Sequence, residues 1–141
     1  DEPQLRYDTP FRSGAQAMET GTSNVIGLAA LGASLELLSQ LSVPAIHAHV
    51  EAYLDALEGG LIERGFSSHR ALAPALRSTL LSVSVPDDVR LSKLAGALRS
   101  RGVICNTPDG LMRFAPHWPN HGDEVRHVLD AVDEALAELR G

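Results

Sequence analysis

The stretch Glu19-Thr20-Gly21-Thr22-Ser23-Asn24, followed directly by the apolar residues 25–38, decides the fold that we predict for this chain. Residues 22–24 are of types that commonly cap helices, and Gly21 permits a sharp backbone turn before them. A helix that begins in this way directs free N–H groups and the positive end of its dipole toward one point, where a phosphate is favoured. An ordinary helix cap has the same composition and is commoner, so both interpretations stay open.

The predicted helix over residues 25–38 is apolar on nearly every side. Its first charged residue is Glu36, close to its end. A helix with no polar face is normally buried against other structure. We therefore expect it to pack on a large domain or on a partner that lies outside this sequence.

The composition is that of a globular protein. The chain has 141 residues, of which 44% are hydrophobic and 21% charged, enough for one domain with a sizeable core. The net charge is −6 and the basic residues are scattered, which argues against nucleic acid as a partner. The single cysteine excludes an internal disulfide, and no secretory signal or membrane-spanning run is visible. We expect a cytoplasmic location, no membrane partner, and, because the chain begins at Asp1 and not at Met, trimming or a longer parent protein.

After residues 1–20, which we expect to form an extended N-terminal segment, helical and extended patterns alternate. Apolar residues at helical spacing predict helices over residues 43–64 and 89–101, and a last helix that Asn120 or His121 is expected to cap. Strand patterns occupy residues 66–70, 78–85, 103–107 and 111–115. The order predicts an α+β fold, in which a small, mostly antiparallel sheet is covered by helices on one side. We assign residues 21–141 to this domain.

Capping and turn residues mark the expected boundaries of these elements. Ser42 with Pro44 is typical of a helix start, and Gly65 and Gly102 are typical of helix ends. Asp87 and Asp88 are expected to cap the helix that follows them. The run Pro108-Asp109-Gly110 predicts a turn between two strands, and the pair Gly59-Gly60 implies that its helix depends on tertiary packing.

The histidines and the cysteine give little indication of chemistry. His47 and His49 are two residues apart and diverge on a helix, while His117 and His121 are separated by Pro119, so no metal-ligand spacing is present. Cys105 lies within a predicted strand and is interpreted as a buried structural thiol. No serine-hydrolase turn and no glycine-rich nucleotide loop occurs.

Arg113 is the more informative charged residue, because it interrupts the apolar strand 111–115. Its side chain either extends outward into water or presents its planar guanidinium to a carboxylate. Bidentate binding of a carboxylate is the contact to which this group is best suited. We regard Arg113 as a candidate binding residue.

Three stretches together resemble the C-terminal segment of class V aminotransferases. These are pyridoxal-phosphate enzymes of fold type I, and they include cysteine desulfurases, kynureninases and related lyases and epimerases. Residues 18–24 resemble the family's E-x-G-T-P-N segment, with Ser23 where proline is usual. Residues 102–106 and 112–117 resemble its closing strands, and Trp118-Pro119-Asn120 resembles its aromatic-asparagine turn with a proline inserted.

The resemblance implies roles for two residues of this chain. Thr22 matches the threonine that helps to hold the phosphate of pyridoxal 5'-phosphate in the neighbouring subunit of a dimer. Arg113 matches the arginine that holds the α-carboxylate of an amino-acid substrate. The catalytic lysine of the family lies in an upstream large domain, and Lys93, on the polar side of a helix, does not replace it. This chain alone is therefore expected to be inactive, with no catalytic residue and no metal ligand of its own.

One departure bears on the branch of the family. Cysteine desulfurases carry a persulfide-forming cysteine on a loop between the closing strands, where this chain has Pro108-Asp109-Gly110. This difference favours the transaminase- or kynureninase-like branches. Two alternatives remain open from the residues: a stand-alone α+β binding or regulatory module without catalysis, and a different enzyme that uses His117 or His121 as a base.

Overall fold

The computed structural model describes residues 10, 13–18 and 21–141 and divides them into two compact units, residues 1–40 and residues 41–141. The first unit contains the short 3-10 helix η1 (Gly14–Met18) and the helix α1 (Val25–Leu41). η1 lies within residues 1–20, for which we expected an extended segment; residues 1–9, 11–12 and 19–20 lie outside the described residues, so that expectation stays a prediction. The compact second unit begins at Leu41, so the assignment of residues 21–141 to one domain stays a prediction.

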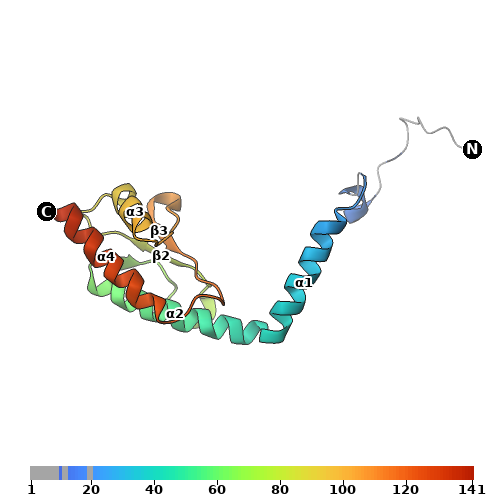
Figure 1. The fold of residues 1–141 in the computed structure, drawn as a ribbon, viewed down its shortest axis with the longest axis horizontal. Helices are drawn as coiled ribbons and strands as arrows, with labels where there is room; N and C mark the ends of the chain where they lie inside the picture. The colour runs from blue at the N-terminus through green and yellow to red at the C-terminus, as the bar shows by residue number, and fades with distance from the viewer. Residues whose placement is uncertain (1–9, 11–12, 19–20) are drawn as a thin grey trace, which may run out of the picture. The chain divides into compact units, whose positions relative to one another are not determined.

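The second unit contains three helices, a small sheet and two short 3-10 turns (Figure 1). In chain order they are α2 (Val43–Glu63), β1 (Ser67–Ser68), η2 (Pro74–Leu76), β2 (Leu81–Ser84), α3 (Leu91–Ser100), η3 (Pro108–Gly110), β3 (Met112–Phe114) and α4 (Glu124–Arg140). The strands form an antiparallel sheet in the order β1-β2-β3. The predicted α+β fold is confirmed.

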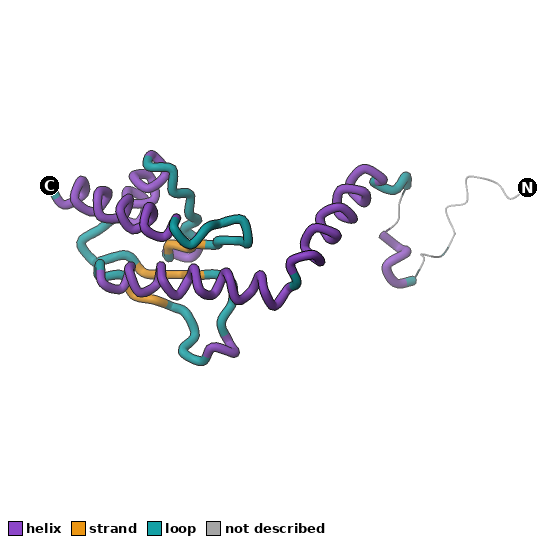
Figure 2. The backbone as a smooth tube through the Cα atoms, turned by 60° about the horizontal axis from the view of Figure 1, so that its bottom comes forward, coloured by secondary structure: helices purple, strands orange, loops and turns teal. Residues whose placement is uncertain are grey.

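The sheet has one face in the core and one open face. Leu81 and Val83 of β2 and Met112 and Phe114 of β3 are buried, and the residues between them are only partly covered. Side chains alternate between the two faces of a strand, so these four buried side chains share one face, which the helices cover. In Figure 2 the strands lie beside α2, and α4 contacts both α2 and α3.

Glycine ends two of the helices as predicted. Gly65 follows α2 with φ +87°, and the Phe66 N–H returns to the Leu61 carbonyl at 3.1 Å. Gly102 follows α3 with φ +81° and has the equivalent return bond. Both are Schellman closures, which glycine permits because it lacks Cβ. The Ser42 cap of α2 is confirmed as well, since its hydroxyl accepts the Ala45 N–H at 3.4 Å.

Two predicted helix caps are wrong. α3 begins at Leu91 without a side-chain cap, because Asp88 instead binds the Arg140 guanidinium at 2.7 and 3.1 Å. α4 begins at Glu124, because the Asn120 side-chain oxygen accepts the His117 N–H and closes the preceding loop.

The predicted strand over residues 103–107 is also wrong. The Val103 N–H is used in closing α3, and Thr107 already has turn dihedrals (φ −127°, ψ 52°). Of residues 104–106, only Asn106 pairs with β3. It forms an isolated bridge with Arg113 through two backbone hydrogen bonds. The Pro108–Gly110 turn is confirmed, with Asp109 and Gly110 both at positive φ.

Among the described residues no single helix is long and apolar enough to cross a membrane. The bent pair α1 and α2 meets the length and composition test only when the two are taken together. One face of α2 is occupied by core residues such as Leu54 and Leu57.

Candidate functional site

Arg113 lies at the centre of the open face of the sheet. It stands opposite Ser82 on β2, and its backbone N–H and carbonyl both pair with Asn106 on the other side, at 2.8 and 3.2 Å. Pairing on both sides fixes the direction of a half-buried side chain. Its Nε donates to the Ser82 hydroxyl at 3.3 Å, while Nη1 and Nη2 make no hydrogen bond to any described residue. The guanidinium therefore keeps two nitrogens for a ligand.

The Arg113 side chain lines a cavity of about 300 Å³ above this face, which we call the Arg113 cavity. The strands contribute Ser82 and Arg113. The loop that joins β1 to β2 contributes the other lining residues, which are His69, Arg70, Ala71, Leu76, Ser78 and Leu80. No carboxylate of the described chain lines it. The charge of Arg113 is therefore not neutralised inside the cavity, and an anionic ligand would be favoured there.

His69 lies on the same open face as Arg113. Its backbone N–H donates to the Ser82 carbonyl at 2.9 Å, and its Nε2 lies 2.7 Å from the Ser84 hydroxyl. The sequence analysis did not single out His69 or Ser82. Ser82 could have been found from the sequence, because Leu81 and Val83 alternate with Ser82 and Ser84. This alternation places the two serines on the face of the sheet opposite the core.

A cluster of charged side chains holds the loop that forms one side of the Arg113 cavity. The Arg70 side chain is only 2% exposed and bonds to Asp55 at 2.5 Å and to Glu58 at 3.0 Å. Arg77 bonds to the same Asp55 at 3.3 Å, and its Nε donates to the Ala71 carbonyl at 3.0 Å. Burial lowers the pKa of Arg70, but its bonds to the two carboxylates outweigh burial and raise the pKa overall. Both ends of the loop are thus tied to α2.

Thr22 lies in the first unit, immediately before α1, and is exposed. The predicted cap is made by Asn24, whose Oδ1 accepts the Gly27 N–H at 2.9 Å. A Cβ on Gly27 would come within 2.5 Å of the Asn24 side chain, so glycine leaves room for this cap. The Val25 N–H bonds to the Ser23 carbonyl. Within the described part of the chain, the Thr22 hydroxyl has no hydrogen-bond partner.

A second cavity of about 410 Å³ lies beside the start of α4. Its lining includes Tyr53, Ile104, Asn120, Glu124 and His127. Burial, and then the charge of Glu124, raise the pKa of Tyr53. The His121 N–H and the Asn120 amide both donate to Glu124 and lower the pKa of its carboxyl. No spacing signal in the sequence predicts that a phenol, a carboxylate and an imidazole from these separate segments lie together.

The other candidate side chains have ordinary surroundings. His117 and His121 are exposed and line neither cavity, and His121 lies 3.2 Å from Asp123. Burial raises the pKa of Cys105, which fits a structural thiol and not a reactive one. In residues 10, 13–18 and 21–141 no three His, Cys, Asp or Glu side chains are grouped so that they could hold a metal ion.

The helices and the small antiparallel sheet match the fold of solved structures of cysteine desulfurase-like proteins. The solved structure of the cysteine desulfurase CsdA from Escherichia coli matches 89% of this chain with a TM-score of 0.78, and a NifS-like protein matches 89% with a TM-score of 0.74. Both are 24% identical to it, and this chain covers 34% and 37% of their lengths. At that identity the likeness shows the fold.

The family follows from sequence. The family model described as Aminotransferase class-V matches residues 1–112, and the chain belongs to this family. The uncharacterized aminotransferase YcbU of Bacillus subtilis is 30% identical over 126 residues, which cover 89% of this chain and 33% of that protein. A probable cysteine desulfurase of Pseudomonas putida is 28% identical over 147 residues, which cover 95% of this chain and 36% of that protein. The chain thus spans about a third of the length of these relatives, whose family is in general dependent on pyridoxal phosphate.

Proposed function

We propose that this chain is the C-terminal part of a pyridoxal-phosphate-dependent, class V aminotransferase-like enzyme that acts on an amino acid as a transaminase or lyase. The observation that carries the proposal is the fixed guanidinium of Arg113 in a cavity without a carboxylate. The family membership and the one-third coverage of the relatives support it. An upstream large domain would complete the site, in a cytoplasmic homodimer.

Arg113 would bind the α-carboxylate of the substrate. Its Nη1 and Nη2 have the parallel geometry that a carboxylate accepts in a bidentate contact, while Ser82 holds Nε. Because the backbone of Arg113 is bonded on both sides, the carboxylate would be placed at one position relative to the rest of the site. The role of this chain would be to bind and orient the substrate.

Thr22 would contribute to holding the cofactor phosphate. The residues present fit such a group, because the exposed Thr22 hydroxyl can donate to an anion beside the positive end of the α1 dipole. The Val25 and Gly27 N–H groups are already bonded within the chain, so the hydroxyl would make the main contact. The cofactor, when bound, supplies an electron sink for the reaction. Lys93 is exposed on α3, so the lysine that binds the cofactor would come from the large domain and not from this chain.

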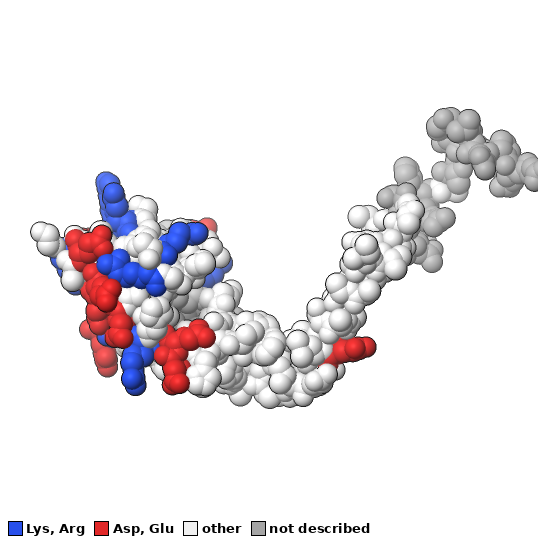
Figure 3. All heavy atoms as spheres, in the orientation of Figure 1, with Lys and Arg blue, Asp and Glu red and all other residues white. Residues whose placement is uncertain are grey.

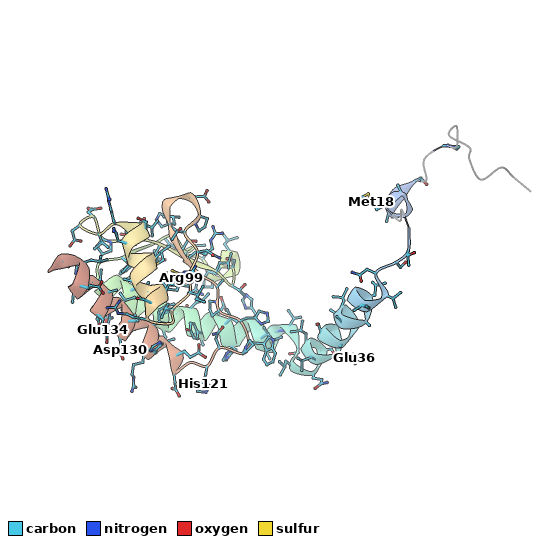
Figure 4. All side chains as sticks on the ribbon, turned by 45° about the horizontal axis from the view of Figure 1, so that its top comes forward. Met18, Glu36, Arg99, His121, Asp130 and Glu134 are labelled. Carbon is cyan, nitrogen blue, oxygen red and sulfur yellow. The ribbon has the colours of Figure 1, made fainter. Side chains whose placement is uncertain are left out.

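The role of Arg113 is tested by Arg113→Gln in the protein expressed at its natural length. Loss of hydrogen bonds to a charged group costs about 1.5–3 kcal/mol, which is about 10- to 150-fold in amino-acid affinity. The matched control is Arg99→Gln, an exposed arginine on α3 that Figure 4 labels, and it should leave the affinity unchanged. Affinity for amino acids that is equal in both variants would remove Arg113 from the site.

The role of Thr22 is tested by Thr22→Ala in the same protein. We expect cofactor affinity, followed by dialysis and absorbance, to fall by about tenfold because one hydrogen bond to a charged phosphate is lost. Thr107→Ala, at an exposed threonine of the second unit, serves as the control. Unchanged cofactor retention in Thr22→Ala would exclude the contact.

The stand-alone binding module remains the second candidate, because the core of residues 41–141 is filled by buried hydrophobic side chains from every helix of that unit. The two functions differ in what they predict for α1. Gel filtration of this chain should show self-association through the exposed apolar residues of α1 if a companion is missing. A monomer at all concentrations would favour the module.

A further inference from the structure

Two exposed leucines line the Arg113 cavity. Leu76 is 76% exposed and Leu80 is 40% exposed, and both belong to the loop between β1 and β2. Leu72 of the same loop is 96% exposed but lies outside the cavity lining. We call Leu76 and Leu80 the leucine wall.

The leucine wall is held in place from α2. Arg70 lies near the start of the loop and Arg77 lies between the two leucines, and both bond to Asp55. The Arg77 bond to the Ala71 carbonyl also closes the loop on itself. A wall that is fixed before a ligand binds loses less entropy on binding than a free loop does.

The polar groups of the cavity are largely satisfied within the protein. His69 is bonded to Ser84, and the Ser82 hydroxyl accepts from Arg113. Arg70 also lines the cavity, and its Nε and Nη2 have no hydrogen-bond partner among the described residues, but its side chain is only 2% exposed. The groups that a ligand in the cavity can reach therefore include the guanidinium end of Arg113 and the apolar surface of the leucine wall. A ligand that satisfies both would carry an anionic group next to an apolar one.

The geometry points to an amino-acid substrate with an apolar side chain, whose carboxylate binds Arg113 and whose side chain packs on Leu76 and Leu80. This inference rests on the proposed function, because it uses the same arginine. Leu76 and Leu80 are then residues that determine specificity. Covering the exposed apolar surface of the two leucines would add to the affinity that the contact with Arg113 provides.

The test uses a homologous series of unbranched carboxylates: acetate, propionate, butyrate and valerate. These lack an amino group and so do not react with the cofactor, and their binding to the natural-length protein is measured by titration calorimetry. We expect affinity to rise by about two- to fourfold with each methylene. In Leu76→Ala and Leu80→Ala this increase should be smaller, whereas in Leu72→Ala it should equal that of the unaltered protein.

The variants separate the two ideas. Arg113→Gln should weaken all four carboxylates alike, and equal binding by this variant would overturn the proposed function together with the inference. Weakening by Arg113→Gln, combined with an unchanged chain-length dependence in Leu76→Ala and Leu80→Ala, would overturn the leucine wall alone. Tighter binding of succinate than of butyrate would also overturn it, since the wall would then be recognising a second charge. Circular dichroism confirms that each variant is folded.

Discussion

The two compact units of this chain use apolar residues in opposite ways. In α1 the isoleucine and every leucine except the partly covered Leu38 are exposed, and none of its residues is buried. In residues 41–141 the equivalent side chains from α2, α3, α4 and the strands form one core. Figure 3 shows the same contrast, with charged groups spread over the second unit and a single acidic group on α1, which Figure 4 labels as Glu36.

This difference between the units shows that the second unit has a hydrophobic core of its own and that α1 contributes no buried residue. The second unit also joins its helices by ion pairs, including Arg64 with Asp133 at 2.6 Å and Arg101 with Glu138 at 2.7 Å. α1 has no acidic residue in its first turn and no basic residue in its last. A helix with apolar residues on every side is normally stabilised by burial, and no residue of α1 is buried in the described chain.

The largest expected effect compares two leucine-to-alanine substitutions. Leu54→Ala, in the core of the second unit, should lower the free energy of unfolding by about 2–5 kcal/mol because it leaves a cavity. Leu31→Ala, in α1, should change it by less than about 0.5 kcal/mol in this chain alone. Urea denaturation measures both. Equal losses would show that α1 is packed in the isolated chain, and the comparison between the units would break.

Helices could be predicted better than strands because their signals are local. The spacing of apolar residues and the closing glycines at Gly65 and Gly102 lie within a few positions of each helix end. The caps were wrong where a distant partner competes for the side chain, as Arg140 does for Asp88. The prediction of a strand at residues 103–107 was wrong because the Val103 N–H bonds to Leu98 at the end of α3. The alternation of apolar and polar residues does not indicate where that helix ends.

The site could be predicted only in part, for a related reason. Arg113 was recognisable because a charge interrupts an apolar strand. The cavity around it is made by residues from another strand and from a loop, such as His69 and Leu76, and its order comes from bonds to Asp55 on α2. Those contacts join positions that share no sequence motif.

The second prediction uses the paired glycines of α2. A Cβ on Gly60 would collide with the methyl groups of Leu129 on α4, whereas a Cβ on Gly59 would meet nothing within 4 Å. Gly59→Ala should stabilise the chain by about 0.5–1 kcal/mol through its higher helix propensity. Gly60→Ala should instead cost up to about 1 kcal/mol, because Leu129 must leave its place in the core.

The same substitution in α1 sharpens the comparison. Gly32 has no neighbour within 4 Å, so Gly32→Ala should raise the helix content seen by circular dichroism without any cost of packing.

Thermal unfolding measures the stability of the two variants of α2, Gly59→Ala and Gly60→Ala. A gain in Gly60→Ala as large as that in Gly59→Ala would contradict the close packing of α2 on α4.

The smallest expected effect concerns pH and belongs to the second unit. The backbone N–H of His121 and the amide of Asn120 lower the pKa of Glu124 below its ordinary value of 4.5. Between these two pKa values the unfolded chain binds more protons than the folded chain, so the contribution of Glu124 is complete above pH 4.5 and is lost as the pH falls through the lowered pKa. In Glu124→Gln, thermal unfolding followed from neutral to acid pH should therefore depend less steeply on pH in that window.

Asp130→Asn, on the exposed side of the same helix and without a hydrogen bond in the described part of the chain, is the control and should keep the original slope. An unchanged slope in Glu124→Gln would mean that the carboxylate does not support the start of α4. The contrast with α1, which has no acidic residue in its first turn, would then rest on the core and the ion pairs alone.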